Sequence, residues 1–142
     1  MRVAILAHGR RLDEPTQTLC AEYIKRARTF LPFELIHCPT AAVQWQRARS
    51  DPGIVVLLDE RGASLSTPEL AARIDRWRTA ATRRLCFLIG GADGFTETER
   101  EGADWVLSLS QLTLPHRLAQ LMLCEQLYRV GTLLAGHPYH HS

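Results

Sequence analysis

Short apolar runs alternate with longer amphipathic segments along the chain, and this alternation constrains the fold more than any other feature. The apolar runs predict strands over residues 3–7, 33–38, 54–58, 85–89 and 105–107. Two of them, 54–58 and 85–89, are apolar almost throughout, which is typical of parallel strands that are covered on both faces. The repeated order of strand and helix therefore predicts an α/β structure with a mostly parallel sheet.

The segments between these runs predict the helices. They cover about 15–30, 41–49, 67–80, a short stretch after Thr96, and 115–135. Two helix starts carry a capping pattern, in which a hydroxyl side chain is followed three residues later by a glutamate. Thr96 begins one of them. In the other, Ser66 can be the cap, but Thr67 with Pro68 in the first turn fits equally well.

The length of 142 residues predicts one domain spanning 1–142, without space for a separate RNA-binding domain. Hydrophobic residues make up 46% of the chain and charged residues 23%, which excludes a disordered tail. The formal charge of +2 is too balanced to indicate a nucleic-acid binder by its net field. The basic excess lies in residues 1–50, which hold eight basic and four acidic side chains.

The sequence carries no signal for a membrane, a disulfide or a metal. No stretch approaches the roughly 18 apolar residues of a membrane span, so a cytoplasmic protein is expected. The histidine-rich segment 137–141 matches no zinc motif. The cysteines are scattered without a C-x-x-C pair, which favours buried free thiols at Cys20, Cys38, Cys86 and Cys124.

Ligands of parallel α/β sheets bind at the carboxyl ends of the strands, so the residues after Leu58, Ile89 and Leu107 are the candidate site. Gly90–Gly94 contains three glycines in five positions and leads into a capped helix. Such a segment suits a close backbone approach to a ligand, but it suits a plain strand-to-helix turn equally well. Asp93 within it could bind a ribose or cap the turn.

The segment 108–116 carries three leucines between a strand and a helix, where a polar surface loop is the norm. We expect it either to line an apolar site or to pack on the core. The helix that follows has a wide apolar surface, which indicates burial against a second subunit. Beyond this helix, Tyr139 and His140 belong either to a frayed terminus or to a site that orients or deprotonates a substrate.

Four motifs follow one another in the last third of the chain. They are FLIGGADGF at 87–95, LSQLTLPH at 109–116, EQLYR at 125–129 and HPYH at 137–140. In this order and spacing they resemble the RlmH family, and segments 32–36 and 66–72 also fit, so the resemblance covers the whole chain. Members of that family are SPOUT-class enzymes that methylate N3 of a pseudouridine in bacterial 23S rRNA.

The resemblance implies a SPOUT-type α/β knot, in which a mostly parallel sheet carries a C-terminal trefoil knot, although chains in general avoid knots. It implies S-adenosylmethionine as the cofactor and no metal. Because Gly90 has no side chain, the ligand would lie directly against its backbone, while Leu109, Leu112 and Leu114 would surround the adenine. Carried over position by position, the cofactor-binding residues are Leu58, Gly90, Leu109, Ser110, Gln111, Leu112, Thr113 and Leu114.

The resemblance also implies that Tyr139 and His140 are the candidate catalytic residues. His140 is the better base, because a neutral imidazole accepts a proton near pH 7. Arg129 and His141 are the candidate substrate-binding residues. The family commonly ends in Tyr-His-Arg, and His141 replaces that arginine with a side chain that is largely neutral at pH 7.

The expected partners are a second copy of the chain in a homodimer and 23S rRNA within the assembled ribosome, with no membrane. The arginines of residues 1–50 are expected to contact the ribosome. Two other functions fit the residues. One is a knot methyltransferase that acts on another RNA, such as tRNA, and the other is a non-catalytic small α/β nucleotide-binding module.

Overall fold

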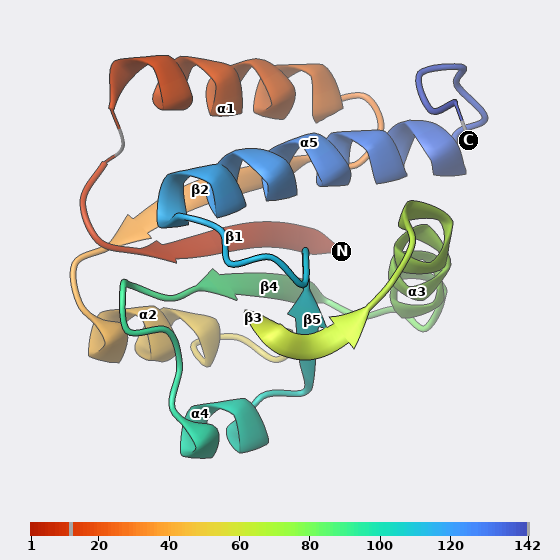
Figure 1. The fold of residues 1–142 in the computed structure, drawn as a ribbon. Helices are drawn as coiled ribbons and strands as arrows, with labels where there is room; N and C mark the ends of the chain where they lie inside the picture. Colours follow the sequence, from red (N-terminus) through yellow and green to blue (C-terminus); the bar gives the residue numbers. More distant parts are fainter. Residues whose placement is uncertain (12, 142) are drawn as a thin grey trace.

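Five parallel strands form one sheet in the computed structural model, which describes residues 1–11 and 13–141 (Figure 1). The order across the sheet is β2-β1-β4-β3-β5, and each neighbouring pair is parallel. The predicted α/β class with a mostly parallel sheet is confirmed. The strands are β1 (Arg2–His8), β2 (Phe33–Cys38), β3 (Ile54–Ser64), β4 (Arg84–Ile89) and β5 (Trp105–Ser108).

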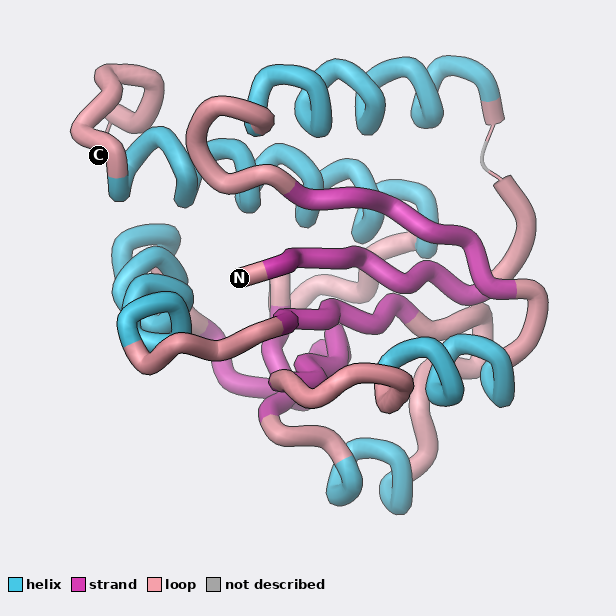
Figure 2. Tube along the Cα trace, turned by 180° about the vertical axis from the view of Figure 1, so that it is seen from behind, coloured by secondary structure: helices cyan, strands magenta, loops and turns pink. Residues whose placement is uncertain are grey.

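Helices cover both faces of the sheet, as Figures 1 and 2 show. Ile5 and Phe87 face the core beneath α1, α3 and α5, whereas Leu6 and Leu88 face the second core, on the side of α2. Successive strand residues alternate between these two cores, and for this reason the run 85–89 is apolar throughout. The helices are α1 (Glu14–Ala27), α2 (Ala41–Ala48), α3 (Thr67–Thr79), α4 (Glu97–Gly102) and α5 (His116–Leu134).

Reciprocal capping contacts start α3 and α4 at the predicted positions. At α3, the Glu69 N–H donates to Ser66 Oγ at 3.3 Å, and the Ser66 N–H donates to Glu69 Oε1 at 3.0 Å. Ser66, and not Thr67, is therefore the cap. Thr96 and Glu99 make the same pair of contacts at α4. Each pair satisfies backbone donors that a helix start otherwise leaves free.

β3 runs beyond the predicted 54–58, because the chain leaves the sheet and then returns to it. Leu58 pairs with Leu107, and Ala63 pairs with the same residue, so residues 59–62 bulge out of the ladder. The return needs Gly62, because a Cβ there would lie 2.6 Å from the backbone carbonyl of Val106. This excursion places three charged residues at the carboxyl edge of the sheet.

α5 is the longest helix and extends for about 28 Å across the face of the sheet. It packs closely on the segment after α1, where a Cβ at Gly131 would lie 2.9 Å from the Cβ of Leu31. All four cysteines are free and buried, which confirms that prediction. Within residues 1–11 and 13–141, no helix has both the length and the apolar character that a membrane span requires.

Candidate functional site

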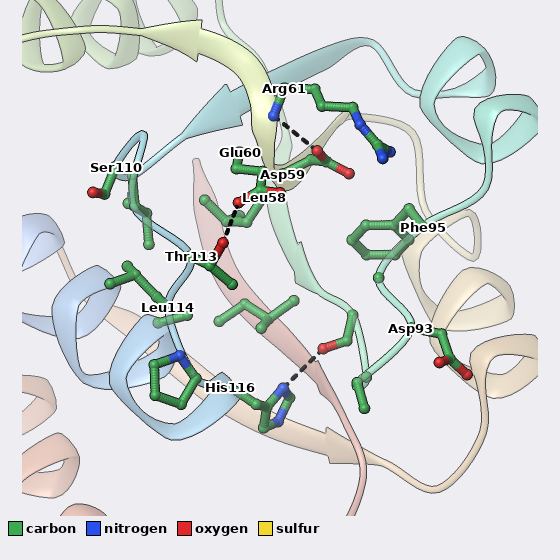
Figure 3. Close-up of a pocket in the computed structure, with 18 of the residues that line it drawn as sticks. Leu58, Asp59, Glu60, Arg61, Asp93, Phe95, Ser110, Thr113, Leu114 and His116 are labelled. Carbon is green, nitrogen blue, oxygen red and sulfur yellow. Dashed lines mark hydrogen bonds between the residues drawn. The ribbon is translucent and has the colours of Figure 1, made fainter.

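The carboxyl ends of β3, β4 and β5 border a cavity of about 650 Å³ (Figure 3). Three segments wall it: the β3 excursion, the glycine-rich segment after β4, and the leucine-rich segment between β5 and α5. This is the edge at which a parallel sheet offers its ligand site. The lining residues are 58–61, 89–95, 109–110, 112–116 and 119.

The cavity brings together residues from all three predicted positions. The predicted cofactor residue Gln111 is not among those that line it. A tight turn accounts for this, because the Leu112 N–H donates to Ser110 Oγ at 2.9 Å and residue 111 is exposed. The other predicted cofactor residues all line the cavity: Leu58, Gly90, Leu109, Ser110, Leu112, Thr113 and Leu114.

Two hydrogen bonds join the walls of the cavity, and both are drawn in Figure 3. Thr113 Oγ1 donates to Glu60 Oε2 at 2.8 Å, which links the leucine-rich segment to the β3 excursion. His116 Nδ1 donates to the carbonyl of Gly90 at 2.8 Å, which links α5 to the glycine-rich segment. Walls that are already joined need little reorganisation to bind a ligand.

A third contact joins the first two walls from the side of α4. Arg100 pairs with Asp59 at 3.5 Å and donates to the carbonyl of Phe95 at 2.7 Å. Arg100 thus offsets the charge of Asp59, and the lining also carries Glu60, Asp93 and Arg61.

Gly90 and Gly91 leave no space for side chains. A Cβ at Gly90 would lie 3.2 Å from the Phe95 ring, and a Cβ at Gly91 would lie 2.5 Å from His8 Nδ1. Gly94 has a φ of +67°, and its N–H donates to the Gly91 carbonyl at 2.9 Å. The two interpretations of this segment are thus compatible, because a tight turn presents bare backbone to the cavity.

Sequence reasoning missed the charged residues of the β3 excursion, Asp59–Arg61, as well as Phe95 and His116. The predicted strand ended at Leu58, where the apolar run stops. The signal that could have found the excursion is a run of three charged residues after a strand whose carboxyl end faces a ligand. Phe95 and His116 end two of the quoted motifs, 87–95 and 109–116, but neither side chain was singled out as a site residue.

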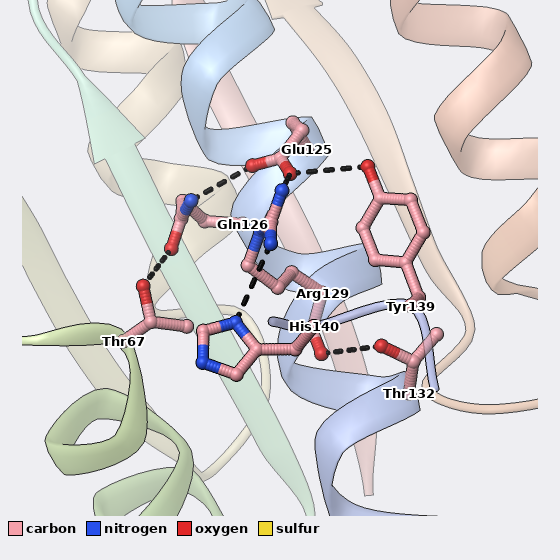
Figure 4. A network of polar contacts seen from close by, with 7 residues as sticks. All are labelled: Thr67, Glu125, Gln126, Arg129, Thr132, Tyr139 and His140. Atoms are coloured by element: carbon pink, nitrogen blue, oxygen red, sulfur yellow. Dashed lines mark hydrogen bonds and ion pairs between the residues drawn. The ribbon is translucent and has the colours of Figure 1, made fainter. Parts of the chain in front are cut away.

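Tyr139 and His140 pack against the second half of α5 and are not frayed (Figure 4). The Tyr139 hydroxyl donates to Glu125 Oε1 at 3.2 Å, and its ring lies 4.6 Å from that of Tyr128. Burial, together with the Glu125 carboxylate, raises the pKa of Tyr139 to about 12. At neutral pH the phenol is therefore protonated, and it acts as a hydrogen-bond donor and not as a base.

The tail and the cavity lie apart in a single chain. The cavity adjoins His116 at the start of α5. The tail, residues 135–141, folds back along the helix, so that Tyr139 and His140 contact Glu125 and Arg129, about 14 and 20 Å along the helix from His116. Of the two predicted substrate-binding residues, Arg129 pairs with Glu125 at 2.6 Å, and His141 is exposed. Neither Tyr139 nor His140 is among the residues that line the cavity.

No metal site is apparent in the part of the chain that the structure describes. Within residues 1–11 and 13–141, no three His, Cys, Asp or Glu side chains form a group that could hold a metal ion.

The amino-acid sequence is similar to a family of methyltransferases over nearly its full length. The model of a family described as predicted SPOUT methyltransferase matches residues 1–140. A Thermus thermophilus protein named ribosomal RNA large subunit methyltransferase H is 44% identical over 140 residues, which cover 99% of this chain and 98% of the relative. A Paracoccus denitrificans protein of the same name is 42% identical over 154 residues, with 99% of each chain covered.

Solved structures share the fold at low sequence identity. A probable methylase family protein from Haemophilus influenzae superposes with a TM-score of 0.62 at 10% identity, covering 99% of this chain and 70% of that chain. A probable methyltransferase from Bordetella pertussis gives 0.61 at 12% identity, covering 91% of this chain and 95% of that chain. At such identities the likeness extends to the fold alone.

Proposed function

Because the chain belongs to the SPOUT methyltransferase family, we propose that it methylates N3 of a pseudouridine in 23S rRNA. The cavity carries this proposal, since three strand ends bring together seven of the residues predicted to bind the cofactor. Full-length similarity to proteins named ribosomal RNA large subunit methyltransferase H supports ribosomal RNA as the substrate. A cytoplasmic location agrees with such a substrate.

The residues of the cavity fit S-adenosylmethionine, which SPOUT methyltransferases use. The volume of about 650 Å³ is that of a typical small-molecule site. Leu109, Leu112 and Leu114 would surround the adenine, and the backbone at Gly90 would lie against the ligand. Glu60 and Asp93 in the lining suit the positive charges of the cofactor's sulfonium and ammonium groups. When bound, S-adenosylmethionine supplies an electrophilic methyl group.

The tail supplies the polar groups that the target base needs. N3 of a pseudouridine belongs to an imide and must lose its proton before it can attack the methyl group. His140 is the proposed base, because a neutral imidazole can accept the imide proton at its unprotonated ring nitrogen. Tyr139 remains protonated and is proposed to orient the tail or the base. Much of the rate enhancement would then come from holding the nucleophile close and aligned.

A homodimer would complete the site, because the tail of one chain could reach the cavity of its partner. An apolar patch on α1 and α5 favours such pairing. Leu19, Leu118 and Met122 are 47%, 42% and 36% exposed, and a groove beside them includes Tyr23 and Leu121. Patches of this kind mark protein interfaces. We propose a second copy of the chain as the partner.

Two features implied by the family resemblance remain predictions. They are the C-terminal trefoil knot and recognition of the assembled ribosome. The proposal assigns no separate RNA-binding domain, so the RNA would be recognised by the methyltransferase fold and its second copy. Arg10 and Arg11 are exposed directly after β1 and are the first candidates for phosphate contacts.

Transfer of a labelled methyl group from S-adenosylmethionine to purified ribosomal particles tests the proposal. We expect about one methyl group per particle, located by mass mapping at a pseudouridine of the 23S rRNA. Transfer to tRNA in place of the ribosome would identify a methyltransferase of another RNA. Binding of the cofactor without transfer would identify a non-catalytic module. Gly90→Trp fills the cavity and serves as the control that loses cofactor binding.

A further inference from the structure

Glu125 lies on α5 at the centre of the contacts that hold the tail in place (Figure 4). Its Oε1 accepts two hydrogen bonds, from Arg129 Nε at 2.7 Å and from the Tyr139 hydroxyl at 3.2 Å, and lies 2.6 Å from Arg129 Nη2 in an ion pair. One carboxylate oxygen therefore ties the second half of α5 to the segment that folds back over it.

Arg129 extends this arrangement to the next residue of the tail. Its guanidinium lies 4.8 Å from the centre of the Tyr139 ring, and its Nη1 is 3.4 Å from His140 Nδ1. The guanidinium thus faces a carboxylate, an aromatic ring and an imidazole. All three of its nitrogens contact Glu125 or His140, which suits a structural role for Arg129 better than a phosphate contact.

A link to α3 holds the other side of the Glu125 carboxylate. Gln126 Nε2 donates to Glu125 Oε2 at 2.7 Å, and Thr67 Oγ1 donates to Gln126 Oε1 at 2.8 Å. Glu125 and Arg129 have 19% and 26% of their side-chain surface exposed, so water screens their pairing only partly. The Glu125 carboxylate is therefore held by Gln126 at Oε2 and by Arg129 at Oε1, in addition to its contact with Tyr139.

We propose that Glu125 is a positioning residue for methyl transfer: it fixes Tyr139 directly and His140 through Arg129, without itself touching RNA or cofactor. This inference rests on the proposed function of the tail. Because the Glu125 carboxylate sets where two side chains lie, its removal shifts them both. A displacement of about 1 Å in a reacting group can lower a rate by about 100-fold.

Kinetics of Glu125→Gln test the role in catalysis. The amide keeps the shape of the side chain but loses the charge that binds Arg129. We expect kcat to fall about 10- to 100-fold, while the KM for S-adenosylmethionine changes less than about twofold, because Glu125 does not line the cavity. Asp75→Asn is the matched control, since it breaks an exposed helical pair with Arg78 and leaves kcat unchanged.

NMR of ¹³Cζ-labelled tyrosine gives a readout that does not depend on activity. In the wild-type chain the Tyr139 signal, assigned from Tyr139→Phe, titrates only at strongly alkaline pH. In Glu125→Gln its midpoint falls toward the ordinary value of about 10, because a neighbouring negative charge is lost. An unchanged midpoint would overturn the proposed contact. A lowered midpoint with wild-type kcat would overturn its role in catalysis.

A second pair of substitutions keeps the inference testable if Glu125→Gln is poorly folded. Arg129→Lys keeps the charge but not the forked donors, and we expect kcat to fall with the KM for cofactor preserved. Adding Tyr139→Phe to Glu125→Gln lowers kcat no further, since both remove the same contact. Strictly additive losses would contradict the proposal.

If the wild-type chain transfers no methyl group to RNA, the proposed function fails, while the NMR result still reports on the contact.

Discussion

At the scale of single residues, neighbours decide what the polar side chains of the tail can do. Tyr139 donates to a carboxylate and is partly buried, so it keeps its proton. His140 faces Arg129 with one ring nitrogen, and the other has no hydrogen-bond partner within residues 1–11 and 13–141. Residue type and the family resemblance could identify these two side chains. They could not reveal that Glu125 holds them, because this contact exists only once the tail folds back over α5.

Tyr139→Phe should leave the pH dependence of kcat unchanged between about pH 6 and 9, because a phenol with a pKa of about 12 does not ionise in that range. The folded-state pKa lies above the unfolded value of about 10. The stabilisation linked to this proton is therefore complete below about pH 10 and is lost as the pH rises toward 12. The pH dependence of kcat and urea unfolding, each measured for the wild-type protein and for Tyr139→Phe, test these effects. Loss of an ionisation from the rate profile of Tyr139→Phe would show that the phenol acts as a base.

At the scale of elements, β3 shows where sequence patterns stop being informative. The helices and the other strands could be predicted, since periodicity or caps such as Ser66 mark each of them locally. The second half of β3, up to Ser64, is polar and is held by pairing with β5, a distant part of the chain. The same limit applies to the site. Its strand ends could be predicted, whereas the charged wall at Asp59–Arg61 depends on this long-range pairing.

Gly62→Ala tests the close approach of β3 to β5. The new methyl group would meet the Val106 carbonyl at 2.6 Å, so the strands must separate. We expect the free energy of unfolding to fall by about 1–3 kcal/mol and the affinity for S-adenosylmethionine to weaken. Gly102→Ala is the control, because the nearest atom to its new methyl group, Arg49 Nη2, lies at an ordinary 3.7 Å. Urea denaturation and calorimetric titration measure both effects, and a Gly62→Ala chain as stable as the control would rule out the tight contact.

At the scale of the whole molecule, α5 separates the two halves of the proposed site. The cavity lies beside His116, whereas Tyr139 and His140 contact Glu125 and Arg129 further along the helix and do not line the cavity. No pattern in the sequence could show this separation, because the tail and two walls of the cavity belong to motifs that are close together in the last third of the chain. The separation is the reason for which a second subunit is proposed.

Mixed dimers test whether the two halves come from different chains. Gly90→Trp removes the cavity, and His140→Ala removes the proposed base, so each variant alone should be inactive. When the two are co-expressed with different tags, about half of the dimers are mixed, and each mixed dimer has one intact site out of two. We expect about a quarter of the wild-type rate. A mixture that stays inactive would show that cavity and tail act within one chain.

Methylation of a pseudouridine in large-subunit rRNA is the central claim, and mass spectrometry of that rRNA from a strain lacking the gene tests it most directly. The expected result is the loss of one methyl group from one pseudouridine. The wild-type chain should restore it, whereas His140→Ala should not. Identical masses for the large-subunit rRNA of the two strains would contradict the claim.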